Sequence, residues 1–310
     1  MFRKALCLIS AAILLFTFNT AARESTDIER TTIWNPPSPG PLNTWSAPLL
    51  KAKELVIQPY FLYYRARGIF NDKGSYKSFT GGEKAHQYVG DLILYYGITD
   101  KLEIDLEGFY YWNYKELAPN VNANDGGFGD SYAYARYCLV EEAVEKPWMP
   151  CITAIAQMKF PIGTYQKLSP EKLGTDMTGT GSYDQGYGVI LTKKIRPFIL
   201  HADFIYNIPI ETTIDEVKTG YANYINCDCA MEYILPKGFN LMIEANYLQQ
   251  GDQRRGGELV PDTDSSSLLL VPGIGWSCEK VKALLCYQRT IAGTNTNVND
   301  SFAFTLVYTF

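Results

Sequence analysis

Apolar and polar residues alternate along most of this chain, most clearly in the stretch "KLEIDLEGFYYWNY", Lys101–Tyr114. Successive side chains of a β-strand point to opposite faces, so alternation with a period of two predicts a strand. One face of this strand would carry Leu102, Ile104, Leu106, Tyr110 and Trp112, and the other would carry Glu103, Asp105, Glu107 and Asn113. The first face requires apolar surroundings, and the second requires water or cations.

Eleven further stretches show the same pattern and, with the stretch above, predict twelve strands. They are Leu55–Tyr64, His86–Ile98, Phe128–Val140, Cys151–Gly163, Gly181–Thr192, Pro197–Ile208, Tyr221–Leu235, Phe239–Gln249, Ser267–Trp276, Val281–Ile291 and Ser301–Phe310.

The connections between these strands alternate in length. "TDK", "KKIR", "PKG" and "SCEK" are short, whereas the connections between them are long and rich in Gly, Asp, Asn, Ser and Thr; "EEAVEKPWMP" is a medium exception. Short turns at one rim, long loops at the other and an even strand count are typical of outer-membrane barrels. A soluble sandwich favours shorter strands and does not segregate loops in this way. The predicted fold is therefore all-β: a transmembrane antiparallel up-and-down β-barrel of about twelve strands, of the outer-membrane type.

The last predicted strand, "SFAFTLVYTF", places Phe302, Phe304, Leu306, Tyr308 and Phe310 at every second position. In a closed barrel this strand pairs with the first, so that no edge stays open. These side chains are expected to point outward and to contact outer-membrane lipid. This alternating aromatic end also resembles the signal that the outer-membrane assembly machinery reads. The expected partners are therefore outer-membrane lipid and that machinery.

The first 52 residues differ from the barrel in pattern. Arg3 and Lys4, an apolar run and small residues up to Ala22 predict a cleaved secretory signal peptide over residues 1–22, and hence export to the outer membrane. The alternative is a permanent anchor, for which the apolar core is short. Residues 23–52 are rich in proline, and we expect either a periplasmic leader or a plug folded into the barrel mouth. Residues 53–310 would form the barrel.

Composition and charge narrow the possible functions. The chain is 46% hydrophobic and 14% aromatic, which excludes a disordered protein. Its formal charge is −5, and removal of Arg3 and Lys4 with the signal peptide lowers it by two. This acidic balance argues against a nucleic-acid partner.

Six cysteines follow the predicted cleavage site. Cys138 with Cys151, and Cys278 with Cys286, flank short connections and could form disulfides in an oxidising compartment; isolated thiols are the alternative. Cys227 and Cys229 would share one face of a strand, in a poor geometry for bonding to each other. With two histidines and no C-x-x-C pair, we expect no metal site, and nothing indicates a cofactor.

No catalytic arrangement is expected from the histidines. Lipid-cleaving barrels place a serine two residues after a histidine, so that both lie within proton-transfer reach. Here Tyr88 follows His86 and Asp203 follows His201, and neither is such a nucleophile. His201 and Asp203 are interpreted as a polar pair on the inner face, and the protein is not expected to be an enzyme.

The predicted inner face carries an excess of acidic groups. The expected lumen-lining residues are Asp91, Glu103, Asp105, Glu107, Asp130, Arg136, Lys159, His201, Asp203, Asp228, Glu232 and Glu244. In a water-filled bore, acidic side chains favour cations. The alternative is a closed lumen in which these charges neutralise one another.

Several short stretches resemble a family of outer-membrane proteins described by the MetA-pathway of phenol degradation. They are "VGDLILYYGITDKLEIDLEG", "GFGDSYAYARY", "TGSYDQGYGVILTKK" and "FTLVYTF". In this resemblance Gly90-Asp91 and Gly129-Asp130 each open a strand. The likeness spans Pro59 to Phe310 and implies a transporter-like barrel that takes up small hydrophobic compounds. It implies no catalytic residues, and the cysteines and the Pro-rich segment depart from the family pattern.

The sequence therefore predicts passive passage of a small solute, of aromatic or hydrophobic character, through an outer-membrane channel with a weak cation preference. A structural or surface-binding barrel with a closed lumen is the main alternative, and an enzyme is the third.

Overall fold

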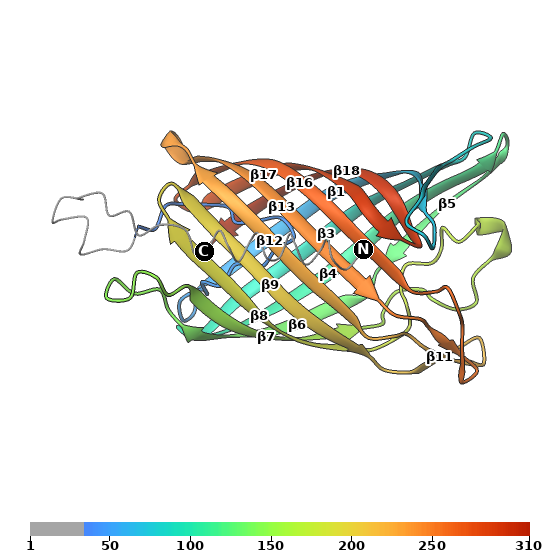
Figure 1. Cartoon of the computed structure of the whole chain (residues 1–310), viewed down its shortest axis with the longest axis horizontal. Coiled ribbons are helices and arrows are strands. Elements are labelled where there is room, and N and C mark those ends of the chain that lie inside the picture. The colour runs from blue at the N-terminus through green and yellow to red at the C-terminus, as the bar shows by residue number, and fades with distance from the viewer. Residues whose placement is uncertain (1–33) are drawn as a thin grey trace.

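The computed structural model describes residues 34–310. The predicted signal peptide, 1–22, and the first part of the Pro-rich segment, 23–33, lie outside the described residues. Twelve long strands form the wall of a barrel (Figure 1). They are β1 (Leu55–Phe70), β3 (Lys84–Thr99), β4 (Leu102–Ala118), β6 (Ser131–Val140), β7 (Cys151–Phe160), β8 (Asp184–Ile195), β9 (Phe198–Pro209), β12 (Tyr224–Ile234), β13 (Phe239–Gln250), β16 (Ser265–Cys278), β17 (Val281–Thr294) and β18 (Thr296–Thr309).

Each wall strand pairs antiparallel with the next along the chain, and the last pairs with the first. β18 lies against β1 from Val56 opposite Thr309 to Phe70 opposite Thr296. This pairing closes the sheet, so the ladder donors and acceptors of both terminal strands are satisfied. The predicted fold class, a closed antiparallel barrel of twelve strands, is confirmed.

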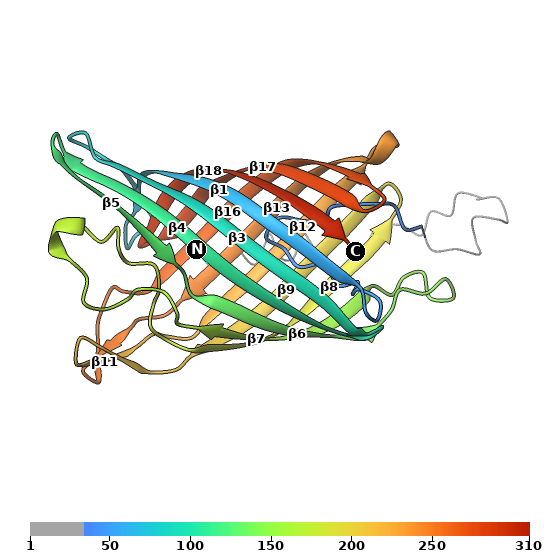
Figure 2. The same cartoon turned by 180° about the vertical axis from the view of Figure 1, so that it is seen from behind.

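The two rims differ as the loop lengths predict. At one rim the strands are joined by tight turns and by the medium connection 141–150; we call it the short-turn rim. The other, the long-loop rim, carries smaller elements (Figure 2): β2 (Tyr76–Ser78), β5 (Val121–Phe128), β10 (Thr212–Ile214), β11 (Val217–Gly220), β14 (Arg254–Arg255), β15 (Glu258–Leu259) and the 3-10 turn η1 (Pro170–Lys172). A second 3-10 turn, η2 (Pro236–Gly238), lies at the short-turn rim. Within residues 34–310, neither helical turn has the length and apolarity to span a membrane.

Three predictions about local structure are wrong. The predicted loop 115–127 is mostly strand, because β4 continues into a hairpin with β5 that turns at Asn120. The predicted loop 292–300 is likewise a hairpin of β17 and β18, with Asn295 between the strands. Both asparagines adopt positive φ, which Asn tolerates well at a tight turn. Gly90-Asp91 lies in the middle of β3, whereas Gly129-Asp130 does precede a strand.

The outer face of β18 carries the aromatic ladder of the chain end. Phe302, Phe304, Leu306, Tyr308 and Phe310 are all exposed, and the residues between them, such as Ala303 and Thr305, are buried on the inner side. The alternation therefore runs apolar outward and small or polar inward, as the membrane requires.

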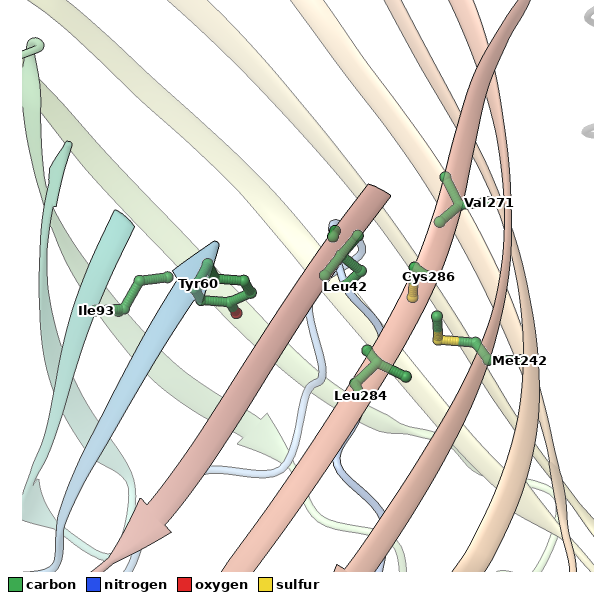
Figure 3. Close-up of a cluster of buried hydrophobic side chains, with 8 residues drawn as sticks. Leu42, Tyr60, Ile93, Met242, Val271, Leu284 and Cys286 are labelled. Carbon is green, nitrogen blue, oxygen red and sulfur yellow. The ribbon is translucent and has the colours of Figure 1, made fainter. Parts of the chain in front are cut away.

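Residues 34–52 form no helix or strand and run inside the barrel; we call them the inner segment. The segment starts near the short-turn rim, where Asn35 accepts a hydrogen bond from Lys194. It reaches the middle of the barrel at Leu42–Trp45 and returns to the rim, where Lys53 donates its backbone N–H to Gly97. Figure 3 shows Leu42 on this coil, facing inward-pointing side chains of β1, β13 and β17.

Candidate functional site

The inner segment is held mainly by its own backbone. The carboxylate of Glu244 accepts the N–H groups of Leu42, Asn43 and Thr44, the last two at 3.1 and 3.0 Å. It also accepts the Thr44 hydroxyl at 2.9 Å. Asp203 accepts the N–H of Trp45 at 2.8 Å. Charge-assisted bonds of this kind are stronger than neutral ones, so these two carboxylates fix the innermost turn of the segment.

Arg136 forms a second anchor with two buried acids. Its Nε donates to Asp105 at 2.7 Å, its Nη2 contacts Glu103, and its Nη1 donates to the carbonyl of Ser46 at 3.1 Å. The guanidinium also lies 4.9 Å from the ring centroid of Trp45. Glu103 and Asp105 are 1% and 0% exposed, so their charges are neutralised inside the wall rather than presented to a bore.

Glu103 also accepts the N–H of Leu50, which ties the returning arm of the inner segment to β4. Ala47 is held between two threonines: its N–H donates to Thr192 at 2.9 Å, and its carbonyl accepts from Thr153 at 2.7 Å. The segment therefore contacts strands on opposite sides of the barrel and spans the short-turn half of the lumen.

His201 pairs with Glu232 and not with Asp203, so the predicted polar pair is wrong. Nε2 of His201 lies 2.9 Å from Glu232, and Nδ1 lies 3.0 Å from the hydroxyl of Thr192. The strand register places Ala230 opposite His201, so Glu232 is a diagonal neighbour of His201 on the next strand, while Asp203 faces the inner segment. Ser38 of the inner segment also donates to Glu232.

A cavity of about 1400 Å³ extends along the lumen past the inner segment, because its lining includes the segment itself, the long-loop half and residues near the short-turn rim such as Lys194, Glu279 and Thr309. Its wall is rich in tyrosine: Tyr60, Tyr64, Tyr95, Tyr111, Tyr132, Tyr134, Tyr221, Tyr224 and Tyr247 line it. Tyr132 and Tyr134 stack with ring centroids 5.9 Å apart, and so do Phe109 and Tyr111 at 6.0 Å. The rings thus give the cavity an apolar surface that also carries hydroxyl groups.

The hydroxyl groups of several lining tyrosines are bonded to polar neighbours. Tyr95 donates to Gln58 at 3.0 Å, Tyr224 donates to Asp184 at 3.1 Å, and Tyr134 donates to Glu107. These bonds fix the rings, so the aromatic wall is preorganised.

Lys159 neutralises the acids on one side of this cavity. Its Nζ lies 2.7 Å from Asp184 and 4.0 Å from Asp130. Asp130 in turn accepts the N–H groups of Gly163 and Thr180 at 3.1 and 2.9 Å. It thereby ties both ends of the loop 161–183 to the barrel wall.

The remaining predicted acids of the lumen are less constrained. Asp91 and Asp228 line the cavity with Glu107. Asp228 accepts the N–H of Tyr247 at 3.2 Å, and one carboxylate oxygen of Asp91 is buried without a hydrogen-bond partner among the described residues.

The twelve predicted lumen residues therefore fall into two groups. In the short-turn half, the inner segment and its anchors bring together Glu103, Asp105, Arg136, His201, Asp203, Glu232 and Glu244. In the long-loop half lie Asp91, Glu107, Asp130, Lys159 and Asp228. Sequence reasoning missed the tyrosine wall, although the inward positions of "SYAYARY" already carried Tyr132 and Tyr134 at alternate places.

All six cysteines of the described residues are free thiols. Of the two alternatives for Cys278 and Cys286, isolated thiols are found and not a disulfide, because Cys278 lies opposite Val281 and Cys286 lies opposite Gly273. Cys278 is also exposed while Cys286 is buried. Cys138 and Cys151 share one buried cluster with Ala47 as separate thiols.

Comparison with known proteins supports this architecture. A family model described as "Putative MetA-pathway of phenol degradation" matches residues 114–306. Among solved structures, an outer membrane channel from Pseudomonas putida F1 is similar with a TM-score of 0.70 and 14% identity, over 87% of this chain and 100% of that chain. The NanC porin is similar with a TM-score of 0.50 and 9% identity, over 81% and 98%. At these identities the likeness shows the fold alone. No curated protein matches the chain.

Proposed function

The chain belongs to the family of the MetA-pathway of phenol degradation, and from this premise we propose that it is an outer-membrane channel for passive passage of a small aromatic or hydrophobic solute. The barrel would span the outer membrane after removal of the predicted signal peptide, with its long loops outside. It would act without catalysis or a cofactor.

The tyrosine-lined cavity carries this proposal. Aromatic rings favour offset or edge-to-face contact with another ring, and their hydroxyl groups can bond a phenolic or carboxyl oxygen. A cavity of about 1400 Å³ exceeds the volume typical of small-molecule sites, so it suits a transit chamber better than a closely fitting pocket.

A weak cation preference belongs to the same proposal. Fewer unpaired acids support it than the sequence indicated. Glu103 and Asp105 are paired with Arg136, and Asp184 is paired with Lys159. The acids left to bias ion passage are Asp91, Glu107 and Asp228.

The inner segment favours a second candidate function. Because it crosses the short-turn half of the lumen and is bonded on several sides, the barrel could be a closed structural or surface-binding protein. For a channel, this segment would have to shift or leave a narrow path beside it.

Single-channel conductance of the refolded chain in a planar bilayer tests both candidates. We expect small steady openings from residues 23–310 and larger openings when residues 34–50 are deleted. The deletion variant must first show the gel mobility of a folded barrel. Silence in both proteins would contradict the channel and favour the closed barrel.

Solute class is tested by adding phenol or cyclohexanol to the conducting protein. Aromatic contacts add about 0.5–1.5 kcal/mol beyond area burial, so phenol should block ~2- to 10-fold more strongly than cyclohexanol. Equal block by the two solutes would remove the aromatic preference from the proposal.

A further inference from the structure

A second depression lies on the outer face of the barrel, near the long-loop rim. It has a volume of about 440 Å³ and is lined by Arg65, Ala66, Arg67, Tyr76, Ser78, Phe79, Glu83, Lys84, His86, Arg289 and Asp300. These residues come from β1, β2, β3, β17 and β18 and from the loop before β3. Of these, β3, β1, β18 and β17 lie side by side in the sheet (Figures 1 and 2), and β2 pairs with β1.

One carboxylate organises the cations of this depression. Asp300 lies 2.6 Å from Nε of Arg67 and 3.4 Å from Nη1 of Arg289, and it accepts the hydroxyl of Tyr287 at 2.7 Å. Two guanidinium groups sharing one carboxylate retain a net positive charge. Because a guanidinium has five N–H donors, most donors of both side chains stay available.

Further positive charge surrounds Asp300, Arg67 and Arg289. Arg65 is exposed and has no ion-pair partner among residues 34–310. Lys84 pairs with Glu116 at 3.0 Å, yet its side chain is still 55% exposed. Arginine fits phosphate through parallel N–H bonds, and a cluster of this kind is typical of phosphate recognition.

The depression lies directly above an aromatic belt. On three strands the outward side chains change from charged at the rim to aromatic or apolar toward the middle of the barrel. On β1 they are Arg65, Tyr63 and Phe61, and on β17 they are Arg289, Tyr287 and Leu285. On β18 they are Asp300, Phe302 and Phe304. Aromatic girdles mark the membrane interface of outer-membrane barrels. The basic groups above the girdle therefore lie at the level of the lipid headgroups.

The opposite wall lacks such a cluster. Toward the long loops, the exposed outward side chains of β7, β8 and β9 include Phe160, Tyr187, Tyr206 and Ile208, which are uncharged. The outer wall of β7, β8 and β9 thus carries no comparable group of cations among these side chains.

We propose that this depression binds the phosphorylated sugar headgroup of an outer-leaflet lipid. The guanidinium groups of Arg65, Arg67 and Arg289 contact the phosphate, and the acyl chains run along the aromatic belt below. The inference rests on the membrane placement in the proposed function, with the long loops outward, but it does not depend on transport.

Native mass spectrometry of the full mature chain in an uncharged detergent tests the site, with purified lipid A as the probe. We expect bound lipid A on the parent protein and little binding of lipid A from which the phosphates have been removed. The variant R65Q/R67Q/R289Q should bind lipid A ~10- to 100-fold more weakly, since each basic residue contributes separately to attraction of an anionic headgroup.

The matched control is R254Q/R255Q/K218Q, which removes three exposed charges from β11 and β14 at the long-loop rim, outside the depression. Unchanged lipid A binding by R65Q/R67Q/R289Q, or an equal loss in the control, would overturn the site. Displacement of lipid A by an equimolar amount of inorganic phosphate would assign the depression to free anions and overturn the lipid assignment. Conductance is measured on the same samples, so a silent channel and an absent lipid site are separate results.

Discussion

In the short-turn half of the lumen, the carboxylates of Glu244 and Asp203 accept backbone N–H groups of the inner segment. In the long-loop half, Asp91 and Glu107 face a part of the cavity whose wall is rich in tyrosine. Both halves have inward acids at alternate strand positions, and they differ in what those acids contact.

The contrast shows that inward charge alone does not define a pore. A buried carboxylate that has backbone N–H or guanidinium partners acts as a structural anchor, because its charge is satisfied locally. An inward carboxylate next to open volume can still act on a solute. The partner of each acid therefore decides between the two roles.

Substitution of Arg136 should give the largest effect on the anchored half. R136M leaves Glu103 and Asp105 buried without their partner, and breaking such a pair costs about 3–5 kcal/mol. We expect a clearly lower urea midpoint for unfolding of the refolded barrel. The triple variant E103Q/D105N/R136M should regain much of the loss, and an R136M midpoint equal to that of the parent would contradict the anchor.

Substitution of Glu244 should loosen the inner segment without unfolding the barrel. E244Q replaces charged acceptors of three backbone N–H groups by one neutral carbonyl, at a cost of about 1–3 kcal/mol. Limited proteolysis within residues 34–52 should become ~5- to 100-fold faster. D91N is the matched control and should leave the cleavage rate unchanged, since Asp91 lies on β3, lines the cavity and is not hydrogen-bonded to the inner segment among the described residues.

Substitution in the tyrosine wall should have a moderate effect confined to the cavity half. Y132L removes a ring that stacks on Tyr134, so block of the conducting channel by phenol should weaken ~2- to 10-fold. Y206L changes an outward tyrosine of β9 and serves as the control. If both variants are blocked as strongly as the parent, the wall does not recognise aromatic solutes.

The smallest expected effect is a pH response of the loops above the cavity. The Lys172 side chain, followed by the N–H of Gly126, lowers the pKa of Asp125 below its ordinary value of 3.8. The contact therefore persists above pH 3.8 and is lost only as the pH falls through the lower, folded-state pKa of Asp125. A spin-label distance between the β4–β5 hairpin and η1 should be constant from neutral pH down to that range. K172Q, which lacks the contact, should show at every pH the increased distance that the parent protein shows only after the contact is lost.

Much of the barrel wall could be predicted from sequence because strand alternation is a local signal. All twelve wall strands overlap their predicted ranges, and the short and long connections lie at opposite rims as expected. The errors fall where polar turn residues also suit an extended hairpin in water, as at Asn120 and Asn295. The choice between a disulfide and isolated thiols at Cys278 and Cys286 stayed open because it depends on strand register, which spacing along the chain does not determine.

The path of the inner segment could not be predicted because its contacts use the backbone. The N–H groups of Leu42, Asn43 and Thr44 reach Glu244 about 200 positions further along the chain. A hydrogen bond from the backbone leaves no side-chain pattern in the sequence. The Pro-rich stretch also lacks the periodicity that would show which of its side chains face the barrel wall. From the sequence, a periplasmic leader and a plug in the barrel mouth therefore both stayed open for this segment.

The position of the inner segment also constrains the order in which the chain can assemble. Its bonds link residues near the start of the described chain to β4, β6, β8, β9 and β13, so its full set of partners exists only when those strands are arranged around it. Contacts of such long sequence separation are slow to form. The inner segment is enclosed when β18 pairs with β1. A fully docked inner segment therefore indicates that the barrel has closed around it.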